Sequence, residues 1–230
     1  MREFGRRIAG STVAEATAHG KHLLINFSND WTLRTHLQMT GAWHIYAPGE
    51  RWRKSPGKAR VILETSGHVA VCFAAPTVQL APRHIVAQRL DDLGPDLMTD
   101  LDCGALAQQL KEDHAGRPAC EVILDQAAVA GLGNVYKSEL LFEFRIHPDA
   151  ALHTVDEQAL AGLLERGHVL LNANRGRSRT TTGSRSSGQT TWVYGRAGNE
   201  CRRCGSAIAY GVRGPLARDT YWCPRCQTVE

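Results

Sequence analysis

The sequence predicts an α+β protein in which a β-rich half is followed by a helical region and a small cysteine-bearing module. Three observations lead to this prediction. Apolar and polar residues alternate with a period of two through most of the first 80 residues, which is the pattern of half-buried strands. After Pro95 the spacing of apolar residues changes to that of amphipathic helices. Near the end of the chain, two Cys-x-x-Cys pairs are separated by 18 residues.

The β-rich part is expected to cover residues 1–92. Asn29-Asp30 and Ser66-Gly67 are turn dipeptides that separate neighbouring apolar runs. Between such turns the runs are rich in Leu, Ile, Val and aromatic residues, which are common in strands. The expected strands cover residues 22–27, 31–39, 41–46, 60–64 and 69–73.

The helical region is expected to cover residues 93–191. Gly131-Leu132-Gly133 interrupts the apolar periodicity between two helices, and Asp156 is suited to cap the start of the last one. The expected helices cover residues 103–114, 121–130, 134–144 and 156–171. Residues 172–191 consist mainly of Gly, Ser, Thr and Arg with almost nothing to bury, so we expect a mobile loop there.

Positive charge is concentrated in the last quarter of the chain. The net charge of all 230 residues is +4, but residues 172–230 contain ten Arg and only three acidic residues. Arg forms bidentate bonds to phosphate and guanine, so this stretch favours a polyanionic partner over a merely solvated face. No apolar run approaches the ~18 residues of a membrane span, and no signal-peptide core follows the start. A soluble, cytoplasmic and monomeric protein without a membrane partner is expected.

The cysteine spacing predicts a zinc finger at residues 192–230. Cys201 and Cys204 form one pair, and Cys223 and Cys226 form the other. Each pair can place two thiolates on one metal ion from a tight turn, and four thiolates complete a structural zinc site with no open position. The alternative, a redox dithiol, needs one such pair in a βαβ setting, which is absent here. The other three cysteines are expected to be buried thiols of a reducing compartment. They are Cys72, Cys103 and Cys120.

These residues together resemble the formamidopyrimidine-DNA glycosylase / endonuclease VIII family of base-excision repair enzymes. The resemblance covers nearly the whole chain, and its segments occur in the order of the family. It implies an N-terminal β-sandwich, a helix–two-turn–helix domain and a C-terminal zinc finger. The segments are Gly20 to Leu24, His36 to Gly41, Leu93 to Asp96, Leu124 to Gln126, Gly131 to Tyr136, and Trp192 to Arg196.

The resemblance implies roles for three polar residues. Lys21 is expected to bind a phosphate near the lesion and to assist elimination, and Arg218 to bind the lesion phosphate in a second elimination. Asn134 is expected to contact backbone phosphate at a helix start, where amide groups point outward. Without the resemblance, Lys21 would be read as a solvated lysine and Asn134 as a plain helix cap. The Arg-rich loop from Arg175 to Arg185 lies where the family has a flexible loop that covers the extruded base.

Gln38 and Met39 lie in the segment that resembles the family's wedge loop. Enzymes that turn a nucleotide out of the duplex often fill the gap with an apolar side chain, and Met39 is suited to this role. The alternation Leu33, Leu37, Met39 equally permits a core methionine. Gln38 is expected to contact the duplex or the unpaired base, and the sequence Gln38-Met39-Thr40 is closer to the endonuclease VIII side of the family.

The sequence departs from the family at its start. The family nucleophile is an N-terminal proline amine followed by a glutamate, whereas Met1 is followed here by Arg2 and the first proline is Pro48. We therefore expect a truncated β-sandwich in which the catalytic segment is missing, through a misplaced start or a fragment. A natural short form would expose sheet edges and core. The finger spacing is two residues longer than usual, and Asp92 replaces a basic residue of relatives.

The predicted function is that of a DNA glycosylase / abasic-site lyase. It would excise oxidised bases from double-stranded damaged DNA near the nucleoid and cleave the strand by β- and δ-elimination. A non-catalytic DNA-binding protein with the same domains is the alternative. A general zinc-ribbon adaptor is the third candidate, and the turn before Asn134 and the strand segment at Lys21 argue against it.

Overall fold

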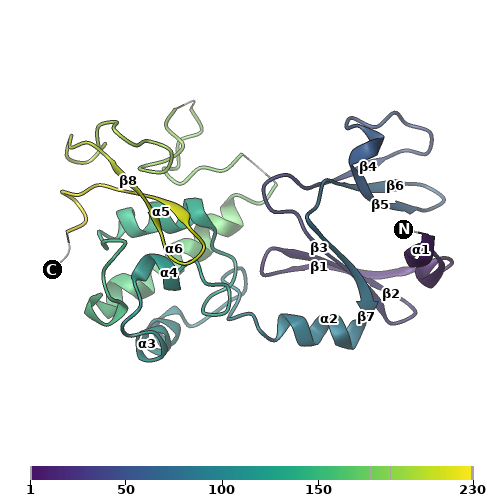
Figure 1. Ribbon diagram of the computed structural model, residues 1–230, viewed down its shortest axis with the longest axis horizontal. Coiled ribbons are helices and arrows are strands. Elements are labelled where there is room, and N and C mark those ends of the chain that lie inside the picture. Colours follow the sequence, from purple (N-terminus) through teal and green to yellow (C-terminus); the bar gives the residue numbers. More distant parts are fainter. Residues whose placement is uncertain (1, 177, 187, 229–230) are drawn as a thin grey trace. The chain divides into compact units, whose positions relative to one another are not determined.

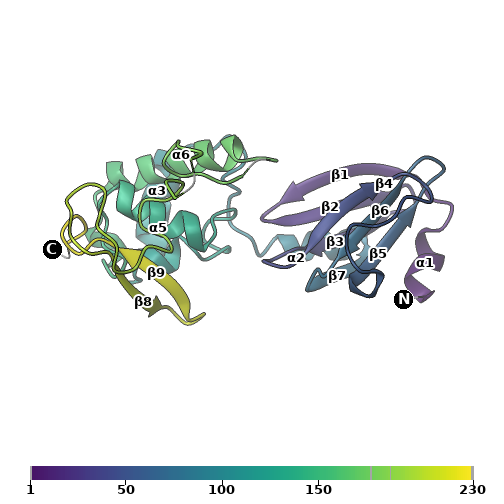
Figure 2. The ribbon, with the colours of Figure 1, turned by 90° about the horizontal axis from the view of Figure 1, so that it is seen from above.

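The computed structural model describes residues 2–176, 178–186 and 188–228 (Figures 1 and 2). The chain forms two compact units, Met1–Asp92 and Leu93–Glu230. The first is built mainly from β-sheets, and the second from helices with a terminal hairpin. The architecture is thus α+β, as the sequence predicts. Within the described ranges, no helix is long and apolar enough to cross a membrane.

Two antiparallel sheets form the first unit. One has the strand order β1-β2-β3-β7 and the other the order β4-β6-β5. Helix α1 (Arg2–Ile8) precedes the strands, and helix α2 (Arg83–Leu90) follows them. The strands are β1 (Val13–His19), β2 (His22–Phe27), β3 (Trp31–His36), β4 (Ala42–Tyr46), β5 (Ala59–Glu64), β6 (Val69–Phe73) and β7 (Thr77–Pro82), with a short 3-10 helix η1 (Pro56–Lys58) before β5.

The inner faces of the two sheets share one core, which makes the unit a β-sandwich. Ile25 on β2 pairs with Leu33 on β3, and Leu33 pairs with Leu80 on β7. All three side chains are buried. Trp43 and Val61 of the second sheet pack against them. The alternation seen in the sequence therefore places one apolar face of each sheet against the other.

A second apolar cluster lies on the opposite face of the β4-β6-β5 sheet. Tyr46, Val71 and Phe73 are buried there, and Trp52 packs over them from the loop between β4 and β5. The Trp52 ring is 5.7 Å from the Phe73 ring in an edge-on arrangement, and the Tyr46 hydroxyl accepts a bond from the Arg53 amide at 3.1 Å. These contacts hold the loop against the sheet.

The helices of the second unit enclose a separate core. It includes Leu110 of α3, Leu140 of α5 and Leu163 of α6, all buried. The Asp156 carboxylate accepts a bond from the Ala159 amide at 2.8 Å, which confirms its predicted capping role. The helices are α3 (Cys103–Asp113), α4 (Ala119–Val122), α5 (Asn134–Glu143) and α6 (Glu157–Ala173), with a 3-10 helix η2 (Leu152–Thr154). The three cysteines outside the two pairs are buried free thiols, as predicted: Cys72, Cys103 and Cys120.

The prediction of a helix at residues 121–130 is wrong. Only α4 is helical there, and the following residues form turns. The Asp125 carboxylate accepts a bond from the Ala127 amide at 3.0 Å, which competes with helical bonding. The Ala130 amide donates instead to the Pro95 carbonyl at 2.9 Å, so tertiary bonding overrides the apolar pattern.

The end of the chain packs onto helix α5. Strands β8 (Ala209–Arg213) and β9 (Arg218–Trp222) form a hairpin, and buried Phe142 of α5 lies in one apolar cluster with Val193 and Ile208. The loop at residues 172–191 also reaches this helix. The expectation that this loop buries almost nothing is wrong, since Thr180 and Thr181 are 6% and 0% exposed.

Candidate metal centre and nucleic-acid interface

The four cysteines of the two pairs come together at the finger. The ligand atoms of Cys201, Cys204, Cys223 and Cys226 all lie within 4.8 Å of one another. The Cys201 and Cys226 sulfurs are 3.9 Å apart, and the Cys204 and Cys223 sulfurs are 3.4 Å apart. Four sulfurs at the usual zinc distance on a tetrahedron are ~3.8 Å apart. The donor set therefore fits one tetrahedral metal ion.

Two thiols of this cluster differ strongly in pKa. Hydrogen bonding by Ser206 lowers the pKa of Cys204 to about 6, whereas burial raises the pKa of Cys226 to about 12. The amide of Arg203 donates to the Cys201 sulfur at 3.4 Å, as in a metal-binding turn. Four thiolates at these separations repel each other, and a divalent cation removes that repulsion.

A buried carboxylate on α5 holds the start of the finger. Glu139 is 1% exposed, and its two oxygens accept bonds from three successive amides. The Trp192 amide donates at 2.6 Å, and the Val193 and Tyr194 amides donate at 2.8 Å each. The Thr181 hydroxyl donates to the same carboxylate. One side chain thus fixes the end of the preceding loop and the entry of the finger.

A buried lysine connects α5 to strand β9. The Lys137 ammonium donates to the Thr220 hydroxyl at 2.7 Å and to the Asp219 carbonyl at 3.1 Å. Burial lowers its pKa to about 8. Because β9 begins at Arg218, these bonds fix the backbone immediately after that arginine.

Arg218 itself lies on the exposed side of the hairpin. It lines a cavity of about 270 Å³ together with Lys137, Arg117 and Arg213. Arg117 and Arg213 form ion pairs with carboxylates at 3.0 and 2.8 Å. In the described part of the chain, Arg218 forms no ion pair, so its guanidinium remains available to an anion.

Asn134 begins helix α5, directly after the turn that contains Gly131. Gly131 has φ +109, and a side chain there would approach Asp96 to 3.4 Å, so the turn requires glycine. The Gln126 side chain braces the turn by donating to the Leu132 carbonyl at 3.0 Å. No side chain caps this helix start. The Oδ1 atom of Asn134 is buried and has no partner among the described residues.

Lys21 lies at the tip of the β1–β2 hairpin. Gly20 and Lys21 have φ +50 and +69, which is the backbone of a two-residue hairpin turn. The Lys21 side chain is exposed. In the adjacent register, His22 pairs with His36, and their rings are 4.7 Å apart. The hairpin turn therefore presents a lysine beside two histidines.

The two histidines are site residues that the sequence reasoning missed. Burial first, and then the nearby Arg34, lowers the pKa of His22 to about 4. Burial and the charge of Lys21 lower the pKa of His36 below its usual value of 6.5. The sequence contained a signal for His36, because this residue is the first of the segment that contains Gln38 and Met39. An anion placed at this group of basic side chains would meet cations and N–H donors together.

The structure places Gln38 and Met39 in a turn and corrects the expected strand 31–39. Strand β3 ends at His36, and Gln38 has φ +47. The Gly41 amide donates to the Leu37 carbonyl at 2.8 Å, which closes the turn. Met39 is 93% exposed, so the core alternative for this side chain is wrong. Since His36 is paired with His22, this turn and Lys21 lie at the same end of the sheet.

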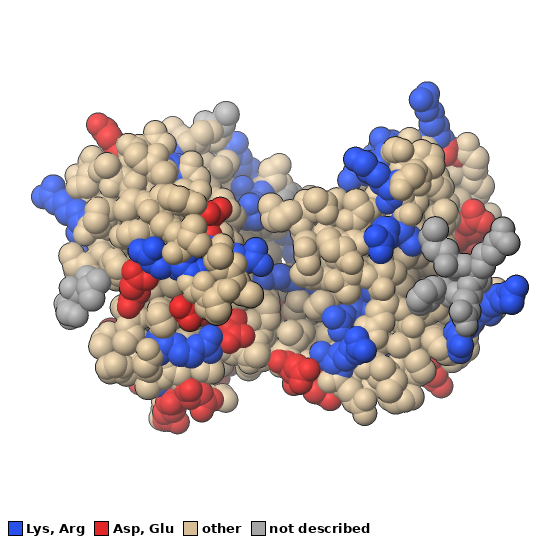
Figure 3. All heavy atoms as spheres, viewed as in Figure 1, with Lys and Arg blue, Asp and Glu red and all other residues tan. Residues whose placement is uncertain are grey.

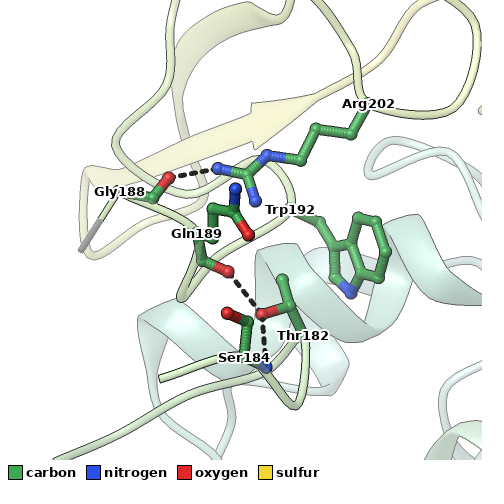
Figure 4. A pocket seen from close by; sticks show the side chains of 6 residues that line it. All are labelled: Thr182, Ser184, Gly188, Gln189, Trp192 and Arg202. Carbon is green, nitrogen blue, oxygen red and sulfur yellow. Dashed lines mark hydrogen bonds between the residues drawn. The ribbon is translucent and has the colours of Figure 1, made fainter. Parts of the chain in front are cut away.

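The loop at residues 172–191 encloses a hollow of about 650 Å³ against the finger (Figure 4). Trp192 and Arg202 form one wall, and Arg202 donates to the Gly188 carbonyl. The Thr182 hydroxyl donates to the Gln189 carbonyl and accepts from the Ser184 amide, the latter at 3.2 Å. The side chains that line this hollow are therefore braced by bonds within the loop.

The chain is similar to known proteins along almost its whole length. Residues 1–77 match the model of the formamidopyrimidine-DNA glycosylase N-terminal domain, and residues 93–184 match that of its H2TH domain. A probable endonuclease 8 2 of Streptomyces coelicolor is 39% identical, with 96% of this chain and 80% of that protein covered. The DNA-(apurinic or apyrimidinic site) lyase Nei2 of Mycolicibacterium smegmatis is 37% identical, with coverages of 97% and 85%.

Solved structures show the same fold. The formamidopyrimidine-DNA glycosylase of Lactococcus lactis, bound non-covalently to DNA with an abasic site, has a TM-score of 0.79 and 24% identity. The similarity covers 99% of this chain and 85% of that protein. A second structure of the Lactococcus lactis protein with abasic-site DNA has a TM-score of 0.77.

Proposed function

The chain belongs to the formamidopyrimidine-DNA glycosylase / endonuclease VIII family, and we propose that it is a DNA glycosylase and abasic-site lyase. Its substrate is double-stranded DNA with an oxidised base, and its products arise by base excision and strand cleavage. The observation that carries this proposal is the presence of two anion-binding groups. One is Lys21 with His22 and His36 in the first unit, and the other is Arg218 with Lys137 at one cavity of the second unit. The start of helix α5 at Asn134 adds outward-pointing amide groups in the second unit.

Lys21, Asn134 and Arg218 bind the sugar–phosphate backbone around the lesion. Cations and helix-start amides are the groups that proteins use for phosphate. In β-elimination a proton leaves C2′ of the opened sugar and the 3′ phosphate departs, and in δ-elimination the 5′ phosphate departs. Lys21 and Arg218 stabilise the negative charge of these leaving phosphates. The resemblance implies an N-terminal proline amine as nucleophile, and no proline precedes Pro48 in this sequence.

Met39 and Gln38 enter the duplex from the turn after β3. The exposed Met39 side chain is free to occupy the space that the extruded nucleotide leaves, as apolar wedges do. The adjacent Gln38 is also exposed and carries both donors and an acceptor for the edge of a base. The loop at residues 172–191 receives the extruded base.

Zinc is the metal that the four-thiolate cluster fits best, and its contribution is structural. Cys201, Cys204, Cys223 and Cys226 would hold it. A bound ion would tie together the two turns that flank the β8–β9 hairpin, on which Arg218 lies. Because the four cysteines would supply all of its ligands, it would offer no open coordination site to the reaction.

Binding to a duplex with a stable abasic-site analogue tests the proposal. We expect preference over the same duplex without the analogue, and a loss of affinity of about tenfold in Lys21→Gln and in Arg218→Gln, since a bond to a charged group contributes ~1.5–3 kcal/mol. Arg225→Gln is the matched finger control, because Arg225 is also exposed. No preference for the abasic analogue would overturn the proposal.

Borohydride trapping separates the enzyme from a non-catalytic DNA-binding protein. A covalent complex with abasic DNA forms only if an amine of the protein attacks the sugar. If the protein is a glycosylase and lyase, we expect this covalent complex to form. Binding to abasic DNA without trapping would instead support the non-catalytic alternative.

A further inference from the structure

The most basic segment of the first unit lies outside the proposed lesion contacts. The basic loop, defined here as residues 47–60, comprises the connection from β4 to β5 and the first two residues of β5. It contains five cationic residues and one acidic residue, Glu50. The cations are Arg51, Arg53, Lys54, Lys58 and Arg60. None of these residues has a part in the proposed reaction.

The basic loop is held in a defined shape by its apolar side. Trp52 stacks on Tyr46 with ring centres 6.3 Å apart and meets Phe73 edge-on. The Arg53 amide donates to the Tyr46 hydroxyl. The Glu50 carboxylate accepts a bond from the Ala47 amide at 2.9 Å, so it is engaged within the turn. The cations are thus presented from an ordered backbone.

The cations of the basic loop are not neutralised by neighbours. Four ion pairs occur elsewhere in the described residues, and each uses an arginine outside the loop. The side chains of Arg51, Arg53, Lys58 and Arg60 are exposed. Lys and Arg side chains gather on the surface over β4 and the loop that follows it (Figure 3). Such a surface binds a polyanion, since each phosphate contact releases condensed counterions.

The position of the basic loop fits DNA better than a short acidic peptide. Strand β4 runs from the turn that carries Met39 to this loop, and its five residues span about 17 Å. Phosphates repeat every ~3.4 Å along one strand, so this length corresponds to about five nucleotides. A duplex bound at Met39 and Lys21 that extends along β4 is therefore long enough to reach the loop, so one DNA partner would account for both surfaces.

We propose that the basic loop is a second binding surface for the phosphodiester backbone of duplex DNA, outside the lesion. This inference rests on the proposed function, because that function places DNA at the other end of β4. The loop would lengthen the DNA footprint and hold the protein on undamaged duplex during the search for a lesion, where binding is almost entirely electrostatic. It adds no sequence preference, since phosphate contacts carry none.

The test compares two triple variants with the unmodified chain. One is Arg51→Ser/Arg53→Ser/Lys54→Ser, and its matched control, Arg51→Lys/Arg53→Lys/Lys54→Arg, keeps every charge. Trp52 is left in place, and thermal unfolding checks that both variants fold. Binding is measured against salt on an abasic-analogue duplex with short flanks, of about three base pairs, and on one with long flanks, of about ten base pairs. One flank is thus shorter and one longer than the reach estimated above.

On the long duplex, the serine variant should have a salt slope less negative by about 0.9 per lost contact, or about 2.7 in total. The control should keep the slope. If the serine variant changes the salt slope on the long duplex alone, and the complex is 1:1, the loop contacts flanking phosphates of the same duplex. If the serine variant instead fails to bind a second duplex that the unmodified chain binds, the loop contacts a separate DNA segment. Both support the inference.

An unchanged salt slope in a folded serine variant would overturn the inference. So would an acidic peptide that binds the basic loop without lowering the affinity for DNA. Failure of the proposed function would give a different binding result. In that case the unmodified chain shows no preference for the abasic analogue, whatever the loop contributes to binding of intact duplex.

Discussion

Replacement of Glu139 by glutamine should destabilise the second unit far more than an ordinary change of one surface charge. The carboxylate is 1% exposed and accepts bonds from the amides of Trp192, Val193 and Tyr194. In Glu139→Gln, one oxygen becomes an NH₂ group, which cannot accept a bond from the Trp192 amide. The other oxygen keeps the Val193 and Tyr194 amides but loses its charge.

The cost follows from these contacts. A hydrogen bond to a charged group contributes about 1.5–3 kcal/mol, and a donor left without an acceptor loses a similar amount. We therefore expect Glu139→Gln to lower the free energy of unfolding by about 2–3 kcal/mol. Since domains have only ~5–15 kcal/mol in total, Glu139→Ala, which leaves all three amides without this acceptor, is expected to fold poorly.

Urea unfolding, followed by circular dichroism and by tryptophan fluorescence, measures this cost. The matched control is Glu143→Gln on the same helix, whose ion pair with Arg166 at 3.0 Å is partly exposed. That pair should contribute at most about 1 kcal/mol. If Glu139→Gln is no less stable than Glu143→Gln, the contacts of the Glu139 carboxylate do not hold the finger in place.

Three further predictions concern the remaining site residues. Phosphate favours the protonated form of His36, and burial lowers the pKa of this side chain below its ordinary value of 6.5. Affinity for duplex DNA should therefore rise as the pH falls below that value. The rise should be lost when Kd is titrated for His36→Gln, and equal rises would contradict the phosphate contact. Burial lowers the pKa of Lys137 to about 8, so the unfolded chain binds the extra proton between that pH and about 10.5. Stability should therefore increase across that range, by at most roughly 3 kcal/mol, and the increase should be absent in urea titrations of Lys137→Met. Met39→Ala should leave thermal stability unchanged, because the side chain is 93% exposed. The same change should slow excision from a paired lesion by roughly tenfold. Met39→Leu is the control, and unchanged excision in the alanine variant would reject the wedge role.

The parts of the fold with local signals were predictable from the sequence. The two Cys-x-x-Cys pairs indicate a four-thiolate cluster because each pair is a self-contained turn, and the ligand atoms do gather within 4.8 Å. The capping role of Asp156 is also local, since its partner is the amide three residues later. Such features depend on neighbours in the chain, which the sequence displays directly.

Features that depend on distant partners were missed. The alternation Leu33, Leu37, Met39 continues past the end of β3, and the sequence does not show that pairing with β7 stops at His36 opposite Thr77. Glu139 and Lys137 look like solvated charges on a helix. Their partners lie 53 and 83 residues away, at Trp192 and Thr220. Only the packed finger makes them interior residues.

The roles of the candidate site residues stay predictions. Lys21 and Met39 lie at one end of a single sheet, and Asn134 and Arg218 lie in the second unit. Lys21, Asn134 and Arg218 are suited to bind phosphate, and Met39 is suited to fill the space that an extruded nucleotide leaves. Excision and cleavage, however, depend on an amine nucleophile, and direct chemical trapping is the way to identify it.

Borohydride trapping of the protein purified from its own source, on an abasic duplex, tests the central claim most directly. Mass spectrometry of the trapped complex identifies the amine and the N-terminal residue together. The account predicts a covalent complex through an amine of the protein, together with tight binding to the abasic duplex. A native protein that binds abasic DNA without trapping would contradict the lyase assignment and leave a non-catalytic DNA-binding protein. Native protein that shows no preference for abasic DNA would contradict both.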